Sequence, residues 1–122
     1  METLKQKVEA FNKLITADET VKAMELYYAG DVALQENEEA PRGGKQACMA
    51  REIALLAKFD LIIEITRQAI DEAGGVVFSE YMMTITDKSN GNVMHRKEIS
   101  VQQWENGLIK TEKFYYNQAA LL

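Results

Sequence analysis

Glu36 has a residue type and a position that suit acid–base chemistry. It ends an alternating stretch in which it shares one face with Val32 and Leu34. If that face is turned to the core, the carboxyl is shielded from water, and burial raises the pKa of a carboxyl. Such a group can accept and return a proton near neutral pH. The alternative is that Glu36 only begins a solvated acidic loop run with Glu38 and Glu39.

His95 and Glu112 are two further candidate catalytic residues. Strand alternation predicts that both lie on the face that also carries Ile99. An imidazole there could be a second acid–base group, because it titrates near neutral pH, whereas the alternative is a histidine with a purely structural role. Glu112 is either a carboxylate of a pocket or the partner of a cation such as Lys97 or Lys110, since an unpaired buried charge is costly.

The composition excludes some classes of function. The chain has 122 residues with 14 Lys and Arg against 19 Asp and Glu, which gives a net charge of −5. An acidic chain without a basic cluster repels phosphate backbones, so no nucleic-acid partner is expected. Hydrophobic residues make up 47% and charged residues 27%, which argues against a disordered chain. The length predicts one domain over residues 1–122.

The counts of cysteine and histidine limit the remaining kinds of site. The single cysteine, Cys48, cannot form an internal disulfide, so we expect a cytoplasmic location and a buried, apolar role for this residue. One histidine cannot make a multi-histidine zinc site, and no spacing indicates a metal or a cofactor. The N-terminus has no apolar signal core, and apolar runs such as residues 53–57 are too short to cross a bilayer, so no membrane association is expected.

Helices in the first part of the chain and strands in the second must position these residues. Apolar residues spaced by three and four predict helices over residues 2–16, from an Asp18 N-cap to near Gly30, and over 45–58. Alternation predicts a short strand over 32–36 and long strands near 60–72, 76–87, 93–105 and 108–116. Turn sequences such as Asn106-Gly107 separate the long strands. This order is typical of an α+β fold with an antiparallel sheet.

The last turn also predicts a register. If Asn106-Gly107 forms a two-residue turn, Ile99 lies opposite Phe114 and Val101 opposite Glu112. One face of the sheet then carries His95 together with Ile99, Val101, Glu112, Phe114 and Tyr116.

The opposite face in this register carries Trp104, Ile109 and Tyr115. The helices can cover only one face of the sheet, and a large exposed apolar patch is unusual for a soluble monomer. We therefore expect a two-fold homodimer that buries Trp104 and Tyr115 between its chains.

Several segments resemble one known superfamily. They are Tyr27 to Glu36, Pro41-Arg42-Gly43, Gln103 to Ile109 and Phe114 to Asn117. With the order of elements, they resemble the SnoaL-like branch of the nuclear-transport-factor-2-like superfamily, which includes ketosteroid isomerase, polyketide cyclases and limonene-epoxide hydrolase. The resemblance covers nearly the whole chain. It implies a cone in which three N-terminal helices fold over a strongly curved antiparallel sheet, with a pocket between them and commonly as a homodimer.

The same resemblance implies that Glu36 is the base that shuttles a proton. Two departures separate this chain from the enzymes it resembles. Phe11 and Asn12 stand where ketosteroid isomerase has a tyrosine on its first helix, and the sheet from Ile99 to Val101 offers no second acid. Limonene-epoxide hydrolase has an aspartate at the position of Phe114, and its arginine and second aspartate map to Tyr81 and Met83. Neither reaction is transferred as a whole.

The candidate pocket wall is mostly apolar or aromatic. Its members, for which core packing is the alternative, are Tyr28, Leu34, Tyr81, Met83, Ile99, Val101, Phe114 and Tyr116. Both faces of the strand over 76–87 carry apolar residues, so either Glu80 or Tyr81 could point inward.

We predict a pocket for a small, mostly apolar molecule that is isomerised, cyclised or hydrated without a cofactor, with Glu36 as general base. The alternative is a non-catalytic module of the same fold that binds a small ligand or mediates dimeric interaction.

Overall fold

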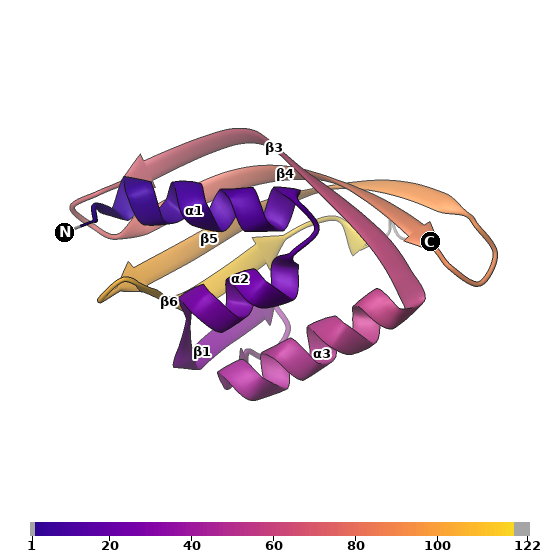
Figure 1. Ribbon diagram of the computed structural model, residues 1–122, viewed down its shortest axis with the longest axis horizontal. Coiled ribbons are helices and arrows are strands. Elements are labelled where there is room, and N and C mark those ends of the chain that lie inside the picture. Colours follow the sequence, from indigo (N-terminus) through magenta and orange to yellow (C-terminus); the bar gives the residue numbers. More distant parts are fainter. Residues whose placement is uncertain (1, 119–122) are drawn as a thin grey trace.

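The computed structural model describes residues 2–118 and combines helices with one mixed sheet (Figure 1). The sheet has six strands in the order β2-β1-β6-β5-β4-β3, antiparallel except for the parallel pair β1 and β6. The predicted α+β class is confirmed. In chain order, the elements are α1 (Leu4–Thr16), α2 (Thr20–Tyr27), β1 (Tyr28–Glu36), β2 (Arg42–Gly43), α3 (Lys45–Lys58), β3 (Phe59–Asp71), β4 (Val76–Asp87), β5 (Val93–Glu105) and β6 (Leu108–Tyr115).

The start of α1 follows from local hydrogen bonding, whereas α2 departs from its predicted bounds. Thr3 and Gln6 form a capping box at the start of α1. The predicted N-cap of α2 at Asp18 is wrong, because Asp18 has a φ of 63° and the cap position is Glu19, with no side-chain hydrogen bond. The helix also ends earlier than predicted, since Tyr28 is extended and already pairs with β6.

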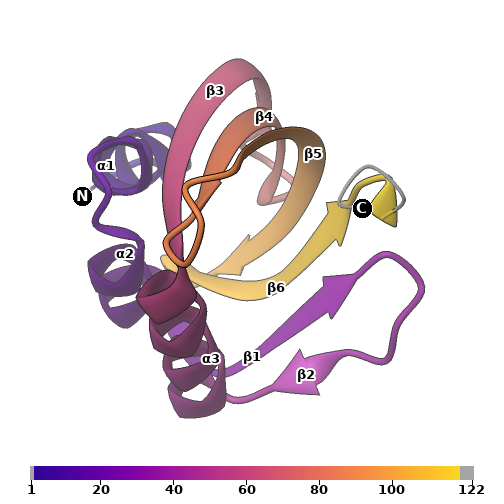
Figure 2. The same ribbon diagram turned by 90° about the vertical axis from the view of Figure 1, so that its right-hand side faces the viewer.

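The long strands bend strongly, and the helices gather on one side of them (Figure 2). We call the sheet face that carries the buried core residues the inner face, and the opposite one the outer face. On β4 the inner face carries Val77, Ser79, Tyr81 and Met83. The choice between Glu80 and Tyr81 is therefore settled in favour of Tyr81.

The turn at Asn106-Gly107 forms as predicted, but the register beyond it does not. Both turn residues have positive φ, 53° and 78°, and Glu105 pairs with Leu108. A β-bulge follows, because Lys110 has no partner on β5. One extra residue on a strand shifts all later pairs by one position.

The bulge changes which residues of β5 and β6 share a face. Ile99 lies opposite Tyr115 instead of Phe114, and Glu112 lies opposite Gln102 instead of Val101. The predicted register is therefore wrong past the bulge, and with it the predicted faces of β5. Its inner face carries Glu98, Ser100, Gln102 and Trp104, whereas His95, Ile99 and Val101 belong to the outer face.

Trp104 is a core residue rather than an interface residue. Its relative exposure is 4%. Its indole packs edge-on against Phe11 of α1, with ring centres 6.1 Å apart, and in a tilted arrangement against Tyr27 of α2, with ring centres 5.9 Å apart. Its Nε1 donates to Gln102 Oε1 at 2.9 Å. Ile109, also assigned to the outer face, is fully buried. The prediction that Trp104 is exposed on the outer face of a single chain is wrong.

Large apolar side chains remain exposed on the outer face. We propose this face as the homodimer interface. Phe78 is 50% exposed, Ile99 37% and Tyr115 43%, on the adjacent strands β4, β5 and β6. Phe78→Glu is expected to shift a dimer towards monomer in light scattering at micromolar concentration, because it places a charge in the apolar patch. Leu26→Glu, on the exposed side of α2, serves as the control.

Two results would contradict this interface. One is a wild-type protein that scatters as a monomer, and the other is a Phe78→Glu variant that assembles like the wild type.

Candidate functional site

Glu112 is the hub of a hydrogen-bond network on the inner face. Its carboxylate accepts from Tyr28 Oη at 2.6 Å, from Ser100 Oγ at 2.6 Å and from Gln102 Nε2 at 2.9 Å. Burial raises the pKa of Glu112, although the hydrogen bonds from Ser100, Tyr28 and Gln102 act in the opposite direction. No cation supplies any of these three hydrogen bonds, so neutral donors hold the carboxyl in place.

The network continues across the sheet as far as α1. Ser79, on β4, accepts from Gln68 Nε2 at 2.9 Å, and Gln68 accepts from Asn12 Nδ2 at 2.9 Å. Tyr81 is linked to it through side-chain hydrogen bonds with Ser100 and Ser79, while burial raises the pKa of its phenol. Buried polar groups that satisfy one another in this way fix a single arrangement of the core.

Glu98 and Arg96 form an ion pair one step along β5 from this network. Residues two apart on a strand point to the same face, so alternation puts both side chains inward. Glu98 is only 5% exposed and pairs with the guanidinium of Arg96. Burial raises the pKa of Glu98 to about 7, and the charge of Arg96 opposes the rise without cancelling it. Glu98 can therefore hold or release a proton near neutral pH.

Glu36 lies at the edge of the same face, in a different environment from the one predicted. It forms ion pairs with Arg42 at 2.9 Å and Arg51 at 3.2 Å, and it accepts from Tyr116 Oη at 2.8 Å. Burial raises its pKa, but the hydrogen bonds from Tyr116 and Arg42 and the two arginine charges outweigh burial and leave the pKa below its usual value. The predicted rise in the pKa of Glu36 is wrong.

Tyr116 joins these two ion-paired groups into one arrangement. Its hydroxyl donates to Glu36, and the guanidinium of Arg96 lies 4.2 Å from the centre of its ring. We call the set formed by Glu36, Arg42, Arg51, Arg96, Glu98 and Tyr116 the arginine–glutamate cluster.

The carboxyls of the inner face also act on one another. The pKa of Glu52, on α3, is raised by burial and by the charges of Glu112 and Glu36. The charges of Glu36 and Glu112 likewise contribute to the raised pKa of Glu98. The arginine–glutamate cluster and the Glu112 network are therefore electrostatically one site.

The sequence-predicted residues divide between the two faces. His95 is exposed on the outer face, where its Nδ1 lies 3.3 Å from Thr84 Oγ1, so the prediction that His95 faces the interior is wrong. Ile99 and Val101 are outside as well, for the same reason of register. The residues on the inner face, besides Glu36 and Glu112, are Tyr28, Leu34, Tyr81, Met83, Phe114 and Tyr116.

Sequence reasoning missed Arg42, Arg96 and Glu98. The spacing Arg96-x-Glu98 is a detectable signal, because alternation keeps both side chains on one face. This signal was missed because the predicted register assigned the inner and outer faces of β5 the wrong way round. Nothing local marks Arg42, which reaches Glu36 from the next strand of the sheet.

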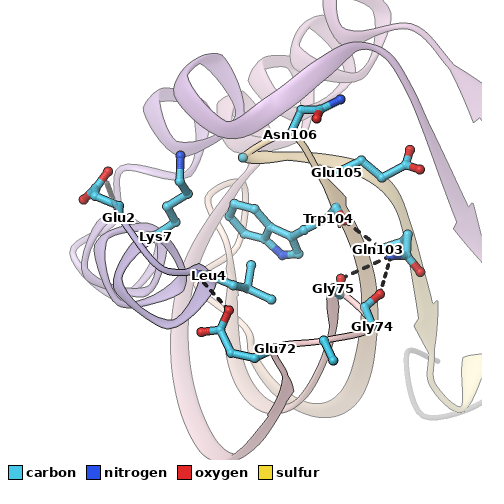
Figure 3. A pocket seen from close by; sticks show the side chains of 12 residues that line it. Glu2, Leu4, Lys7, Glu72, Gly74, Gly75, Gln103, Trp104, Glu105 and Asn106 are labelled. Carbon is cyan, nitrogen blue, oxygen red and sulfur yellow. Dashed lines mark hydrogen bonds between the residues drawn. The ribbon is translucent and has the colours of Figure 1, made fainter.

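Two surface hollows lie away from this site. A hollow of about 420 Å³ is bordered by Leu4, Glu72 and Trp104 (Figure 3), and one of about 530 Å³ lies beside Phe59 and Lys88. Two polar residues that line the first hollow have structural roles: Glu72 accepts from the backbone N–H groups of Leu4 and Lys5, and Gln103 donates to the carbonyl of Gly74. Neither hollow is lined by Glu36, Glu98 or Glu112.

Residues 2–118 contain no group of three or more His, Cys, Asp and Glu side chains arranged to hold a metal ion. No helix in the described part of the chain has the length and apolar character needed to cross a bilayer.

The fold has close counterparts among solved structures. A candidate polyketide cyclase from Pseudomonas putida KT2440 matches with a TM-score of 0.84 and 17% identity over 99% of this chain and 96% of its own. An NTF2-like protein from Burkholderia pseudomallei K96243 matches with a TM-score of 0.83 and 15% identity over 99% and 95%. The chain has the nuclear-transport-factor-2-like fold.

Other matches lie within the same fold. A candidate SnoaL-like polyketide cyclase from Mesorhizobium loti has a TM-score of 0.82 and 22% identity over 94% of this chain and 100% of its own. An LEH-like epoxide hydrolase from M. tuberculosis has a TM-score of 0.77 and 14% identity over 94% of this chain and 79% of its own. No family model matches the sequence. No curated protein matches it either. At these identities the likeness is one of fold.

Proposed function

We propose that this chain is a cofactor-independent enzyme that moves a proton on a small, mostly apolar molecule, in an isomerisation, cyclisation or hydration. In this proposal the acid–base group is Glu98 rather than Glu36. The observation that carries it is a buried carboxyl whose pKa is raised to about 7, next to a fixed cation. General acid–base catalysis is most efficient when the pKa of the group lies near the working pH.

The surroundings of Glu98 supply what proton transfer needs. Arg96 holds the carboxyl in one orientation and can stabilise an oxygen that gains negative charge. Tyr81 lies beside Glu98 in the register of β4 and β5 and offers an apolar ring. Glu36, held by Arg42 and Arg51, stays ionised and in this proposal positions Tyr116 rather than accepting a proton. The cyclase and epoxide hydrolase names of two of the structural neighbours agree with this class of chemistry.

Exchange of carbon-bound hydrogen for deuterium tests the proposal without knowledge of the natural substrate. A base that removes a proton next to a carbonyl leaves an enolate, and the solvent returns a deuteron to that carbon. We expect the protein to accelerate this exchange for a small bicyclic ketone such as 2-tetralone in D2O near neutral pH, followed by proton NMR. Glu98→Gln should slow the exchange by about 10²- to 10⁴-fold, the usual contribution of a positioned acid–base group.

Glu105→Gln is the matched control, because Glu105 is an exposed carboxylate on the same strand. It should leave the exchange rate unchanged. An exchange rate equal to that of buffer, or equal rates for the wild type and Glu98→Gln, would overturn the proposal. Binding of the ketone without exchange would instead favour the non-catalytic binding module.

A further inference from the structure

Tyr116 lies directly after β6 and connects Glu36 with Arg96. Its hydroxyl donates to Glu36 Oε1 at 2.8 Å, and Cζ of the Arg96 guanidinium lies over its ring, 4.2 Å from the ring centre. Its backbone N–H donates to Asn37 Oδ1 at 2.9 Å. The residue is therefore held at three points, which are its backbone, its ring and its hydroxyl.

The turn that follows β1 holds the backbone of Tyr116. Asn37 has a φ of 49°, a conformation that asparagine adopts more readily than most residues. Its backbone N–H donates to the carbonyl of Phe114 at 2.8 Å, and its side-chain oxygen accepts from the N–H of Tyr116. These two hydrogen bonds continue the contact of β1 with β6 beyond the last paired residues, Glu36 and Phe114. They fix the place from which the phenol reaches Glu36.

The Arg96 guanidinium contacts both the Glu98 carboxylate and the ring of Tyr116. Its buried Nε atom has no hydrogen-bond partner among residues 2–118, so no hydrogen bond from that atom orients the side chain. A long side chain with several rotatable bonds loses much freedom when it is fixed, and a planar guanidinium stacks well on an aromatic face. The orientation of Arg96 towards Glu98 therefore depends on the ring.

We propose that Tyr116 is a positioning residue for Glu98, because its ring holds the guanidinium of Arg96 against the Glu98 carboxyl. This inference rests on the proposed function, in which Glu98 is the acid–base group. It adds the residue that keeps the counter-charge of that group in place. Glu36 and Asn37 in turn hold Tyr116.

The charged groups around Glu98 determine what loss of the ring would do. Burial raises the pKa of Glu98 to about 7, and the charges of Glu36 and Glu112 add to the rise. Tyr81, which pairs with Glu98 across β4 and β5, has a phenol whose pKa is raised by burial, so it is uncharged at neutral pH. The guanidinium of Arg96 opposes the rise. If this cation moves away, the pKa of Glu98 should increase further.

Titration of the glutamate side chains by carbon-13 NMR in two variants tests the role of the ring. Tyr116→Leu removes the ring, so the pKa of Glu98 should rise by about one unit, as expected when an opposite charge is withdrawn. The midpoint of the pH profile of ketone exchange should move upward with it. Tyr116→Phe keeps the ring and should retain the wild-type titration of Glu98. It should instead raise the pKa of Glu36, which loses a hydrogen bond to its ionised form.

Tyr115→Leu is the matched control. Tyr115 precedes Tyr116 in the chain, and its ring also lies near a cation, with Lys113 Nζ 4.7 Å from the ring centre. It is 43% exposed on the outer face, however. This variant should leave the titrations of Glu98 and Glu36 unchanged.

A measurement on the wild type decides the case if Tyr116→Leu does not fold. An aromatic ring shifts the signals of protons above its face upfield. The side-chain N–H signals of Arg96 should therefore lie upfield of those of the exposed Arg67. Signals of Arg96 at the same position as those of Arg67 would overturn the proposal, because the guanidinium would not be held on the ring.

The outcomes also separate this inference from the proposed function. An unchanged titration of Glu98 in Tyr116→Leu would overturn the positioning role, even if Glu98→Gln abolishes ketone exchange. A Tyr116→Phe variant that moves the pKa of Glu98 as far as Tyr116→Leu does would also overturn it, because the ring would not be the cause. A raised pKa of Glu98 in Tyr116→Leu, in a protein without ketone exchange, would support the positioning role and count against the proton-transfer function.

Discussion

Trp104→Ala is expected to lower the free energy of unfolding by about 3–5 kcal/mol, the usual cost of removing a large buried aromatic side chain. The indole is buried against Phe11 and Tyr27, so its removal leaves a cavity where α1, α2 and β5 meet. It also leaves the side-chain oxygen of Gln102 without its donor. Urea unfolding followed by circular dichroism measures the loss.

Leu26→Ala is the control for this change, because Leu26 is an exposed apolar residue of α2. Its effect should stay within about 0.5 kcal/mol, as for most surface substitutions. A loss of less than about 1 kcal/mol for Trp104→Ala would contradict the account, because cavities left by Trp cost more than this. Trp104 would then belong to the outer face.

Glu112→Leu is the second substitution with a large expected effect, about 3 kcal/mol of lost stability. Leucine nearly fills the volume that the Glu112 side chain occupies. Tyr28, Ser100 and Gln102, however, each lose their hydrogen-bond acceptor in the core. Each buried donor left without a partner costs about 1–3 kcal/mol, and removal of the desolvated carboxyl offsets part of the sum. Urea unfolding followed by circular dichroism measures the loss.

Glu112→Gln separates loss of hydrogen bonds from loss of shape. Its amide oxygen can still accept, and the hydroxyls of Tyr28 and Ser100 can turn to accept from its nitrogen. This variant should cost at most about 1 kcal/mol, in line with the net value of one hydrogen bond. Equal losses for Glu112→Leu and Glu112→Gln would contradict the role of Glu112 as the acceptor that the network needs.

The elements of the fold could be predicted from the sequence where local signals agree. Residues 45–58 form the predicted helix, and the strands over 76–87 and 93–105 have their predicted bounds. The Asn106-Gly107 turn forms because both residues tolerate positive φ. These features depend on residues that are close together in the chain. Hydrophobic periodicity and turn residues are signals of such local structure.

The faces of β5 could not be predicted because one bulge decides them. Lys110 has no partner on β5, and nothing in its residue type marks it as the extra position. Because side chains alternate with a period of two, this single residue pairs Glu112 with Gln102 instead of Val101. For this reason the sequence did not identify Trp104 and Glu98 as residues of the inner face.

The environment of Glu36 was beyond sequence reasoning for a different reason. Its position at the end of an apolar row was predicted, and burial does act to raise its pKa. The groups that reverse the shift come from three places: Arg42 on β2, Arg51 on α3 and Tyr116 after β6. A pKa depends on such distant charges, which no local pattern contains.

The most direct test of the account is the titration of the glutamate side chains by carbon-13 NMR between pH 3 and pH 9, with Glu98→Gln used to assign the signal of Glu98. Glu98 is expected to titrate with a pKa of about 7, and Glu36 with a pKa below the ordinary glutamate value of 4.5. A Glu98 signal that titrates near 4.5 would contradict the claim that this carboxyl is held ready to transfer a proton at neutral pH.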